Sequence, residues 1–339
     1  DGYSGEISRK GHGLQRALIL TLLQELAKIS NSEEDNSTDY EPELILAIEE
    51  AELYQHPMKA KYLNNLFKEL TQSTEDKKAS NQILLTTHSP YFVDVKNFDQ
   101  LVMIRKVAEP PFTVPFSKAQ HQTVEYVIKE LERINSVGEG TFSRKSTIAR
   151  IIPVMTTIVN EGFFAEAIVL VEGMSDASAL STLDSLLKYE WVRKGIHIIP
   201  VEGKNNIDRP TIIFRGFGIP TYYIFDGDKK EGSNVVNSNI IYQKLSRETE
   251  IEEHPTTQVH KDWAVFEETL ETEIMNSIGK ETYVKLREAV AKDLGYPKPS
   301  LVEKNSEGIS RLIFEIYKAG YKIEVLEDIC ARINQMVSE

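Results

Sequence analysis

The chain has 339 residues, 41% hydrophobic and 27% charged, so it can bury a sizeable core, and its length suggests about two domains. Its apolar runs are too short to cross a bilayer, and its first residues lack a basic stretch followed by an apolar one, which excludes membrane spans and an intact signal peptide. The 39 basic and 52 acidic residues leave a formal net charge of -13, which argues against a general basic coat for nucleic acid but not against a local groove or metal-held phosphates.

The first part of the chain alternates helix and strand patterns. Apolar residues recur at helical spacing over 14–28 and again over 59–70, so we expect two helices. The polar and acidic stretch 30–41 predicts an exposed connection. Two strands separated by a helix indicate a parallel α/β unit. The predicted strands are 44–48, 83–86 and 101–107.

A second α/β pattern follows an interruption by Pro110, Pro111 and Pro115, after which helical spacing resumes over 124–134 and near 147–162. Its predicted elements are strand 167–171, helix 176–189, strand 196–201, an undefined segment 206–217, strand 221–225, a polar and mobile insertion 229–261, and helices 265–277, 280–293 and 307–318.

These patterns predict an α/β protein in three parts. Residues 1–108 hold the first parallel unit, 109–162 form a mostly helical connector, and 163–339 form a parallel-sheet domain that ends in helices. Cys330, the only cysteine, cannot form an internal disulfide. We therefore expect a thiol packed on a helix and a protein of the reducing cytoplasm.

Two acids end the first predicted strand. Glu49 and Glu50 directly follow 44–48, and acids at the end of a buried strand are costly unless a cation compensates them. Magnesium with a nucleotide is the usual compensation, one carboxylate reaching the ion and its neighbour polarising the attacking water. Solvated acids at a strand end are the alternative, and the dipeptide alone does not decide between them.

Two further features have the chemistry to contact phosphates. His88 leaves the end of the next apolar strand, where a neutral histidine can contact a terminal phosphate or hold the water. The run Lys10-Gly11-His12-Gly13-Leu14-Gln15-Arg16 opens a helix, and its glycines allow close backbone approach to an anion. Taken singly, a structural histidine and an ordinary turn are the alternatives.

In this order the three features resemble the back half of an ATP-binding-cassette (ABC) ATPase of the kind found in recombination, chromosome-maintenance and overcoming-lysogenization-defect (OLD) proteins. The resemblance implies that Gly11 to Arg16 is the signature motif, which contacts ATP bound by a second subunit, with His12 in place of the usual serine. It also implies that Glu49 is the Walker B acid, Glu50 the catalytic acid and His88 the switch histidine.

The phosphate-binding loop of such an ATPase is the missing piece. No G-x-x-x-x-G-K-[ST] sequence occurs in the chain, so we expect no ordinary ATP binding by this chain alone. The loop then belongs either to a missing N-terminal part or to another polypeptide.

Carboxylates follow two strands of the second pattern. Strand 167–171 runs into Glu172-Gly-Met-Ser-Asp176, and the strand at 221–225 runs into Asp226-Gly-Asp228. The carboxyl ends of parallel strands meet at one sheet edge, so these four acids can converge there. Without a cation they would raise one another's pKa values, so the cluster predicts a site for Mg²⁺ or Mn²⁺. An ordinary surface turn is the alternative for the Asp-Gly-Asp tripeptide.

With Val201-Glu-Gly-Lys-Asn205 between them, these motifs resemble the TOPRIM domain of topoisomerases, primases, recombination-repair proteins and OLD-family nucleases, over about residues 163–230. The resemblance implies that Glu172 is the metal or acid/base glutamate and that Asp226 and Asp228 are metal ligands. It implies that Asp176 is an added ligand.

Two further residues are assigned by the same resemblance. The segment from Trp263 to Glu271 looks like the OLD-family segment that supplies another carboxylate, for which we choose Glu267 over the alternative of a solvated helix face. Lys304 resembles the family lysine that neutralises charge at the scissile phosphate. An exposed lysine is the alternative there, and Lys298 is a competing candidate.

Six basic residues also have the charge to line a groove that contacts DNA phosphates without reading sequence, although scattered surface cations are the alternative. They are Arg144, Lys145, Arg150, Lys204, Arg209 and Arg215.

An ATPase part, a helical connector and a TOPRIM part, in this order, resemble the layout of OLD-family ATP-dependent endonucleases, including Gabija-type antiphage nucleases. The resemblance implies a Mg²⁺- or Mn²⁺-dependent DNA endonuclease with two metals about 4 Å apart. It implies gating by ATP, a homodimer or larger assembly, and a helicase or another defence protein as a further partner. Two alternatives stay open: an ATP-regulated DNA-binding or structural module with an inactive TOPRIM domain, and a primase- or topoisomerase-like enzyme.

Overall fold

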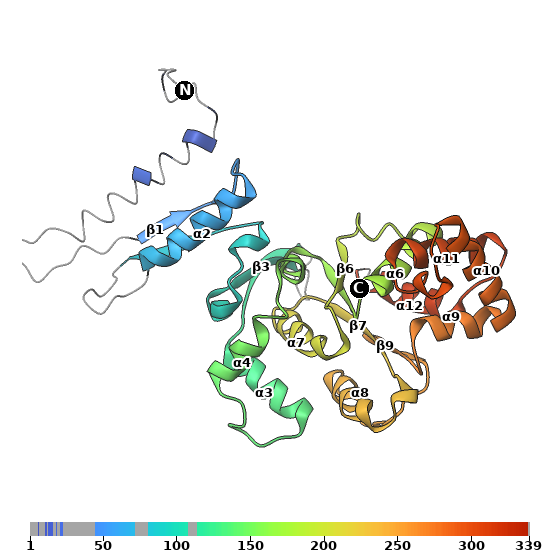
Figure 1. The fold of residues 1–339 in the computed structure, drawn as a ribbon. Coiled ribbons are helices and arrows are strands. Elements are labelled where there is room, and N and C mark those ends of the chain that lie inside the picture. Colours follow the sequence, from blue (N-terminus) through green and yellow to red (C-terminus); the bar gives the residue numbers. More distant parts are fainter. Residues whose placement is uncertain are drawn as a thin grey trace, which may run out of the picture. The chain divides into compact units, whose positions relative to one another are not determined.

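The computed structural model describes residues 6, 11, 13–15, 18, 21–22, 45–71, 81–107 and 114–337. By its internal contacts the chain divides into two compact units, residues 1–94 and 95–339, whose elements are labelled in Figure 1. Of the helix expected over 14–28, the described residues 14, 15, 18, 21 and 22 are helical, and the rest of that prediction lies outside the described residues.

The first unit contains the predicted parallel α/β pair. Strands β1 (Ile45–Ile48) and β2 (Gln82–Leu85) run parallel, with Ile45 opposite Gln82. Helix α2 (Pro57–Thr71) connects them and packs its apolar side into a small core. The buried members of that core are Ala51, Ala60, Leu63, Phe67 and Phe92.

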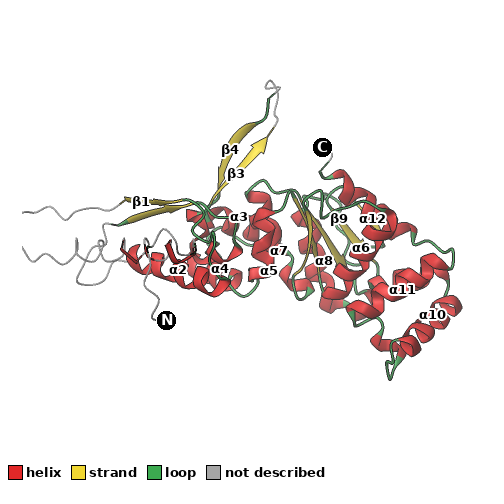
Figure 2. Cartoon of the chain, turned by 90° about the horizontal axis from the view of Figure 1, so that it is seen from above, coloured by secondary structure: helices red, strands yellow, loops and turns green. Residues whose placement is uncertain are grey.

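The second unit begins with an antiparallel hairpin. The predicted strand at 101–107 forms β3 (Val102–Val107), but its partner is β4 (Phe116–His121), which the sequence reading missed. Only Phe116 and Ala119 of β4 are apolar, so it carries no apolar run that would have marked it. Figure 2 shows this hairpin standing away from the larger sheet.

The helical part of the predicted connector is more broken than expected. Helix α3 (Val124–Asn135) matches the expected helix 124–134. The single helix expected near 147–162 is instead α4 (Arg144–Ile151), a short α5 (Thr157–Asn160) and a 3-10 turn, Glu161–Phe164. Pro153 lies between α4 and α5, and its missing N–H together with its ring prevents a continuous helix there.

A five-stranded sheet organises the second unit. Its order is β6 (Ile196–Pro200), β5 (Ala167–Val171), β7 (Thr221–Asp226), β9 (Trp263–Phe266) and β8 (Gln258–Val259). The first four strands are parallel and only β8 is antiparallel. Residues of β5 are buried without alternation, as expected for a parallel strand covered on both faces.

Helices cover both faces of this sheet (Figures 1 and 2). Alternate strand residues, such as Val169, Tyr222 and Ala264, join one core with α6 (Met174–Leu187) and the C-terminal helices. Those helices are α9 (Leu270–Ile278), α10 (Lys280–Asp293), α11 (Ser306–Lys318) and α12 (Glu324–Gln335). Helices α7 (Asp208–Gly216) and α8 (Ser233–Leu245) lie on the other side.

Two local predictions in this unit are wrong, and two helices were not predicted. The undefined segment 206–217 contains α7, and the insertion expected to be mobile contains α8, whose buried Val235 and Tyr242 hold it in place. The helix expected from 265 is preceded by strand β9, because its first residues fill the middle of the sheet. Helix α12 was not predicted, and its buried residues include Cys330.

No helix among the described residues is both long enough and apolar enough to span a membrane.

Strand β9 provides a test of this fold. Trp263 is 1% exposed and stacks on Phe225 at 5.8 Å and on His260 at 4.1 Å. We expect Trp263→Ala to lower the free energy of unfolding in urea by about 3–5 kcal/mol, because it leaves a large cavity. Val192→Ala, at a residue that is 89% exposed, should change it by less than about 0.5 kcal/mol. Equal, small effects of the two substitutions would contradict the placement of β9.

Candidate functional site

Acidic side chains converge at the carboxyl edge of the large sheet. Glu172 follows β5, and Asp226 is the last residue of the neighbouring β7. The Asp226 backbone N–H donates a 2.8 Å hydrogen bond to Glu172 Oε1, which joins the two strand ends. Asp176 lies in the first turn of α6, and its Oδ2 accepts a 2.8 Å hydrogen bond from the Gly173 N–H. The structure therefore brings Glu172, Asp176 and Asp226 together at this edge, and Asp228 lies near enough for its charge to raise the pKa values of Glu172 and Asp226.

Burial makes these carboxylates hard to ionise. It raises the pKa of Glu172 to about 7, with Asp176 and Asp228 adding repulsion, while the Asp226 N–H and Lys204 act in the opposite direction. Burial likewise raises the pKa of Asp176 to about 6. The pKa of Asp226 lies well above its ordinary value, first because the group is buried and then because Glu172 and Asp176 repel its charge.

Glu271 is the member of this group that the sequence reading missed. It lies in the first turn of α9, and its charge raises the pKa values of both Asp176 and Asp226. The predicted acid of this segment, Glu267, instead forms an ion pair with Lys229. Helix α9 begins only at Leu270, after strand β9 and a turn, and this start places Glu271 in the first turn of the helix, near the cluster. The sequence pattern had indicated a continuous helix from 265, and Glu271 was therefore not selected.

Asp228 is held by a lysine. Its carboxylate Oδ2 is 2.9 Å from Lys204 Nζ, and the same ammonium donates to the Asp226 carbonyl oxygen. Asp228 has a left-handed backbone (φ 48°), and the preceding Gly227 lies so close to β9 that a Cβ there would be 2.7 Å from the Phe266 carbonyl oxygen. A side chain at residue 227 would therefore clash with the backbone at the end of β9, which requires glycine between the two acids.

The donor chemistry of this cluster fits a hard divalent ion. It consists of buried carboxylate oxygens whose charges repel one another, and a divalent cation removes that repulsion. Among the described residues, no group of three or more acidic, histidine or cysteine side chains is placed to hold a metal ion with the side chains as they stand. The acids that would hold Mg²⁺ or Mn²⁺ are Glu172, Asp176, Asp226 and Asp228, with Glu271 beside them.

Lys304 lies on an exposed turn before α11. Within the described parts of the chain, no hydrogen bond or ion pair joins its ammonium to the cluster, so its role stays a prediction. Its neighbour Glu303 binds Tyr283 and Arg287, at 2.6 Å each, which anchors this turn to α10.

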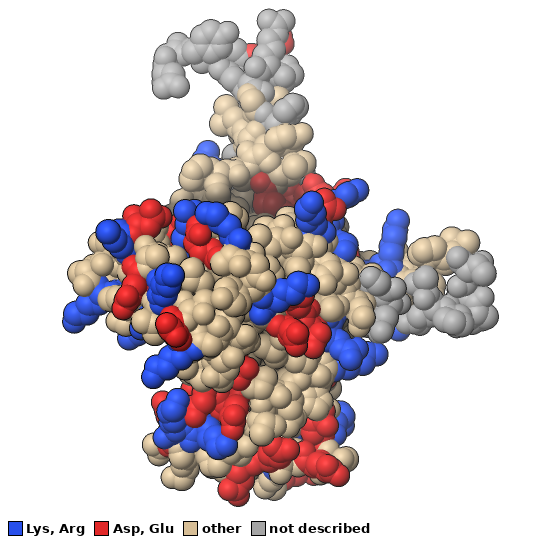
Figure 3. All heavy atoms as spheres, turned by 90° about the vertical axis from the view of Figure 1, so that its right-hand side faces the viewer, with Lys and Arg blue, Asp and Glu red and all other residues tan. Residues whose placement is uncertain are grey.

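Several of the cations expected to line a DNA groove have partners within their own unit. Arg144 pairs with Asp99 at 2.6 Å, and Arg215 pairs with Asp262 at 2.7 Å. On the face drawn in Figure 3, basic and acidic side chains are interspersed. These cations therefore have structural roles in the structure as it stands.

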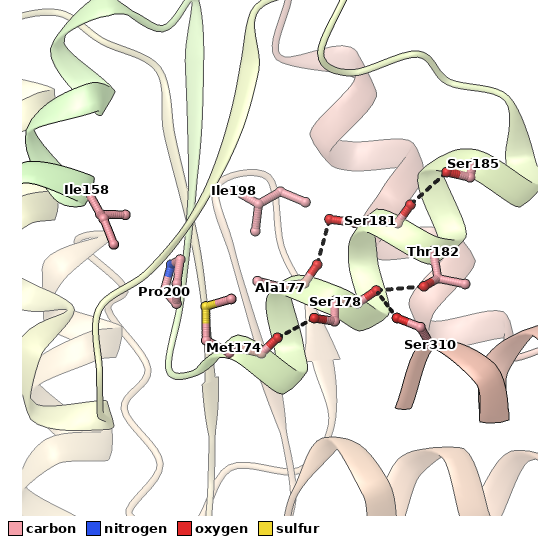
Figure 4. Close-up of a pocket in the computed structure, with 10 residues that line it drawn as sticks. All are labelled: Ile158, Met174, Ala177, Ser178, Ser181, Thr182, Ser185, Ile198, Pro200 and Ser310. Atoms are coloured by element: carbon pink, nitrogen blue, oxygen red, sulfur yellow. Dashed lines mark hydrogen bonds between the residues drawn. The ribbon is translucent and has the colours of Figure 1, made fainter. Parts of the chain in front are cut away.

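A groove of about 570 Å³ runs along α6 (Figure 4). It is lined by Met174, Ser178 and Thr182 of this helix and by Ile198 of β6. The hydroxyls of Ser178 and Thr182 donate to carbonyl oxygens one turn back in α6, at 2.7 and 2.8 Å. The hydroxyl donors of these two residues are thus already used within the helix, so they are not available to bind a ligand in the groove.

The first unit brings two more predicted residues together. Glu50 follows β1, has φ 46°, and donates its N–H to Thr86 Oγ1 at 3.2 Å. Its carboxylate Oε1 is 3.8 Å from Nε2 of His88, which is 82% exposed. The carboxyl ends of two parallel strands thus place an acid and a histidine side by side, and Glu49 directly precedes Glu50 in the chain. Glu52, not predicted, accepts the His88 N–H at 2.6 Å.

The glycine-rich run is described only in part. A Cβ at Gly13 would be 2.6 Å from the Tyr54 carbonyl oxygen, and Gln55 donates to the Gly13 carbonyl oxygen at 3.2 Å. Gly11 accepts from the N–H groups of Leu14 and Gln15 at a helix start. The predicted role of His12 lies outside the described residues.

Two parts of the chain match known domain families. Residues 1–93 match the AAA ATPase domain, and residues 163–228 match the TOPRIM domain of overcoming lysogenization defect protein-like proteins. The expected order, an ATPase segment followed by a TOPRIM domain, is confirmed. The second match contains Glu172, Asp176, Asp226 and Asp228.

Two curated relatives match this chain over a longer stretch. The chain is 26% identical over 227 residues to the Old nuclease of Escherichia phage P2, which is 66% of this chain and 34% of that protein. It is 25% identical over 218 residues to the OLD nuclease of Thermus scotoductus, 64% of this chain and 35% of the relative. The matched stretch thus spans about a third of the length of these relatives.

Among solved structures, the C-terminal region of the Burkholderia pseudomallei OLD protein matches with a TM-score of 0.39 and 17% identity, over 51% of this chain and 99% of that chain.

The raised carboxylate pKa values predict how stability depends on pH. Between the ordinary carboxyl pKa of about 4.3 and the value of about 7 at Glu172, the folded protein binds more protons than the unfolded chain. We therefore expect the free energy of unfolding of metal-free protein to fall as the pH rises through this window. Glu172→Gln cannot titrate, so relative to this variant the wild type should lose stability from pH 5 to 8, measured by urea unfolding with a chelator present. A difference between the two proteins that does not change with pH would contradict the prediction.

Proposed function

We propose that this chain, which joins an AAA ATPase segment to an OLD-like TOPRIM domain, is the part of an ATP-regulated, metal-dependent nuclease that cleaves phosphodiester bonds of DNA. One observation carries the proposal: Glu172, Asp176 and Asp226 converge, buried, at adjacent strand ends inside the segment that matches the TOPRIM family. A relative named as a nuclease in phage P2 supports the same assignment.

In this proposal the acids hold Mg²⁺ or Mn²⁺. When bound, two such ions can activate water and stabilise the leaving oxygen of a phosphodiester. Glu172 would serve as a metal ligand or as the acid/base glutamate, and a bound divalent ion would lower its pKa from the value of about 7 that burial gives it in the metal-free protein. Asp176, Asp226 and Asp228 supply further oxygens.

Two side chains complete the proposed site. Glu271 is the acid of its segment best placed to add an oxygen, because its charge already acts on Asp176 and Asp226. Glu267 is the second candidate, since it would first have to release Lys229. We propose Lys304 as the cation that neutralises charge developing on the scissile phosphate.

The first unit is proposed to regulate the nuclease through ATP. Glu49 and Glu50 would act with magnesium and the attacking water, and His88, 3.8 Å from Glu50, would contact the terminal phosphate. Gly11 to Arg16 would bind ATP held by a second subunit, which requires a homodimer or larger assembly and a phosphate-binding loop from elsewhere. A helicase or another defence protein is a further proposed partner.

One observation favours a second candidate function. Lys204 already pairs with Asp228, so the acid cluster has a cation of its own. An ATP-regulated DNA-binding module with an inactive TOPRIM domain would use the cluster in this way. It would bind DNA, and it would not cut when magnesium is added.

Cleavage of supercoiled plasmid in Mg²⁺ or Mn²⁺ tests the nuclease proposal. We expect nicked or linear product from the wild type, and a rate lowered more than about 100-fold in Asp226→Ala and Asp228→Ala, since loss of even outer partners of metal ligands costs roughly 10–100-fold. Glu231→Gln removes an exposed acid near the cluster and should keep the wild-type rate. Intact plasmid with every folded protein would overturn the proposal, and relaxed, religated circles would favour a topoisomerase.

The ATPase assignment has its own test. In a preparation that hydrolyses ATP through this unit, Glu50→Gln should lower the hydrolysis rate by about 100-fold, because the water loses its polarising carboxylate. Mn²⁺ binding by the TOPRIM acids should be unchanged in the same variant. An ordinary ATPase rate in Glu50→Gln would show that Glu50 is not the catalytic acid.

A further inference from the structure

Lys204 is a cation built into the acidic cluster. Its side chain is only 11% exposed, its Nζ is 2.9 Å from Asp228 Oδ2, and it donates to the Asp226 carbonyl oxygen. Its charge also acts on Glu172, whose pKa it lowers against the effect of burial. An ammonium that is largely shielded from water, beside several carboxylates, offsets part of their negative charge.

The backbone around Lys204 is arranged to hold it there. Glu202 and Gly203 have φ values of 58° and 125°, and the Gly203 N–H donates to the Glu172 carbonyl oxygen at 2.8 Å. The Tyr242 hydroxyl donates to the Lys204 carbonyl oxygen, and Asn206 donates to the Val201 carbonyl oxygen at 3.0 Å. A left-handed residue that is not glycine costs free energy, so this turn is maintained by its anchors.

We propose that Lys204 is an internal counter-ion that occupies the cation position of the cluster in the metal-free protein and releases Asp228 when a divalent ion binds. This inference rests on the proposed metal site. Among the described residues no three such side chains are placed to hold a metal ion, and the ammonium already engages one of the four carboxylates.

Lys204 and a divalent ion compete for the Asp228 carboxylate. An ammonium and a divalent ion repel each other, and both require the same Asp228 oxygens. Metal binding must therefore break the 2.9 Å ion pair and release the ammonium toward solvent. The counter-ion thus stabilises the metal-free protein and weakens its affinity for metal.

Binding of Mn²⁺ in the absence of DNA, followed by the electron paramagnetic resonance signal of the free ion, tests the proposal. We expect Lys204→Met to bind Mn²⁺ about tenfold more tightly than the wild type, because one competing charge is removed. Lys204→Arg keeps the charge and should stay within about threefold of the wild type. Lys230→Met, at an exposed lysine outside the cluster that pairs with Glu268 at 3.7 Å, is the matched control and should not change the affinity.

A second measurement uses the wild type alone, in case Lys204→Met does not fold. Acetylation by an amine-reactive reagent, read by mass spectrometry, should be slow at Lys204 without metal and increase severalfold with saturating Mn²⁺, while labelling of Lys230 stays constant.

The outcomes separate this inference from the proposed function. Mn²⁺ affinity that is unchanged or weaker in Lys204→Met, or Lys204 labelling that does not respond to Mn²⁺, overturns the counter-ion. Absence of Mn²⁺ binding by the wild type, or equal binding by Asp226→Asn, overturns the metal site itself.

Discussion

Repulsion between buried carboxylates is the constraint on which this site depends. The parallel strands β5 and β7 end side by side, and each delivers an acid to the same edge of the sheet. Burial raises the cost of ionising these groups, and each charge raises the cost of the next. A folded protein can maintain such an arrangement only if other groups offset the negative charge. Here backbone N–H groups and Lys204 do so and, in our account, divalent ions.

The fold distributes this cost over several elements. Strand β9 adds to the sheet next to β7, and the turn after it places Glu267 against Lys229 and sends Glu271 toward the cluster at the start of α9. Helix α8 contributes Tyr242, which holds the turn that carries Lys204. Segments that look like surface insertions in the sequence are therefore structural supports of the site.

Much of this architecture follows from local pattern. Apolar runs ending in acids identified β5 and β7 with Glu172, Asp176, Asp226 and Asp228, because strand ends and sheet edges are set by burial and parallel pairing. The positions of Glu271 and Lys204 in the site could not be predicted from local pattern. The position of Glu271 depends on whether residues 263–266 form a strand or a helix, and four apolar residues are compatible with either. The position of Lys204 depends on the left-handed turn at Glu202 and Gly203. Helix α12 packs on α6, which lies far away in sequence, and β4 contains few apolar residues, so the sequence reading missed both elements.

The most direct test of the central claim is a crystal structure of the protein soaked in Mn²⁺, with anomalous scattering used to locate the ion. Our account predicts an anomalous peak at the edge of the sheet, about 2.0–2.3 Å from carboxylate oxygens of Glu172, Asp226 and a third acid of the cluster. It would be contradicted by a well-ordered cluster that has no anomalous peak at saturating Mn²⁺, with Lys204 still bound to Asp228.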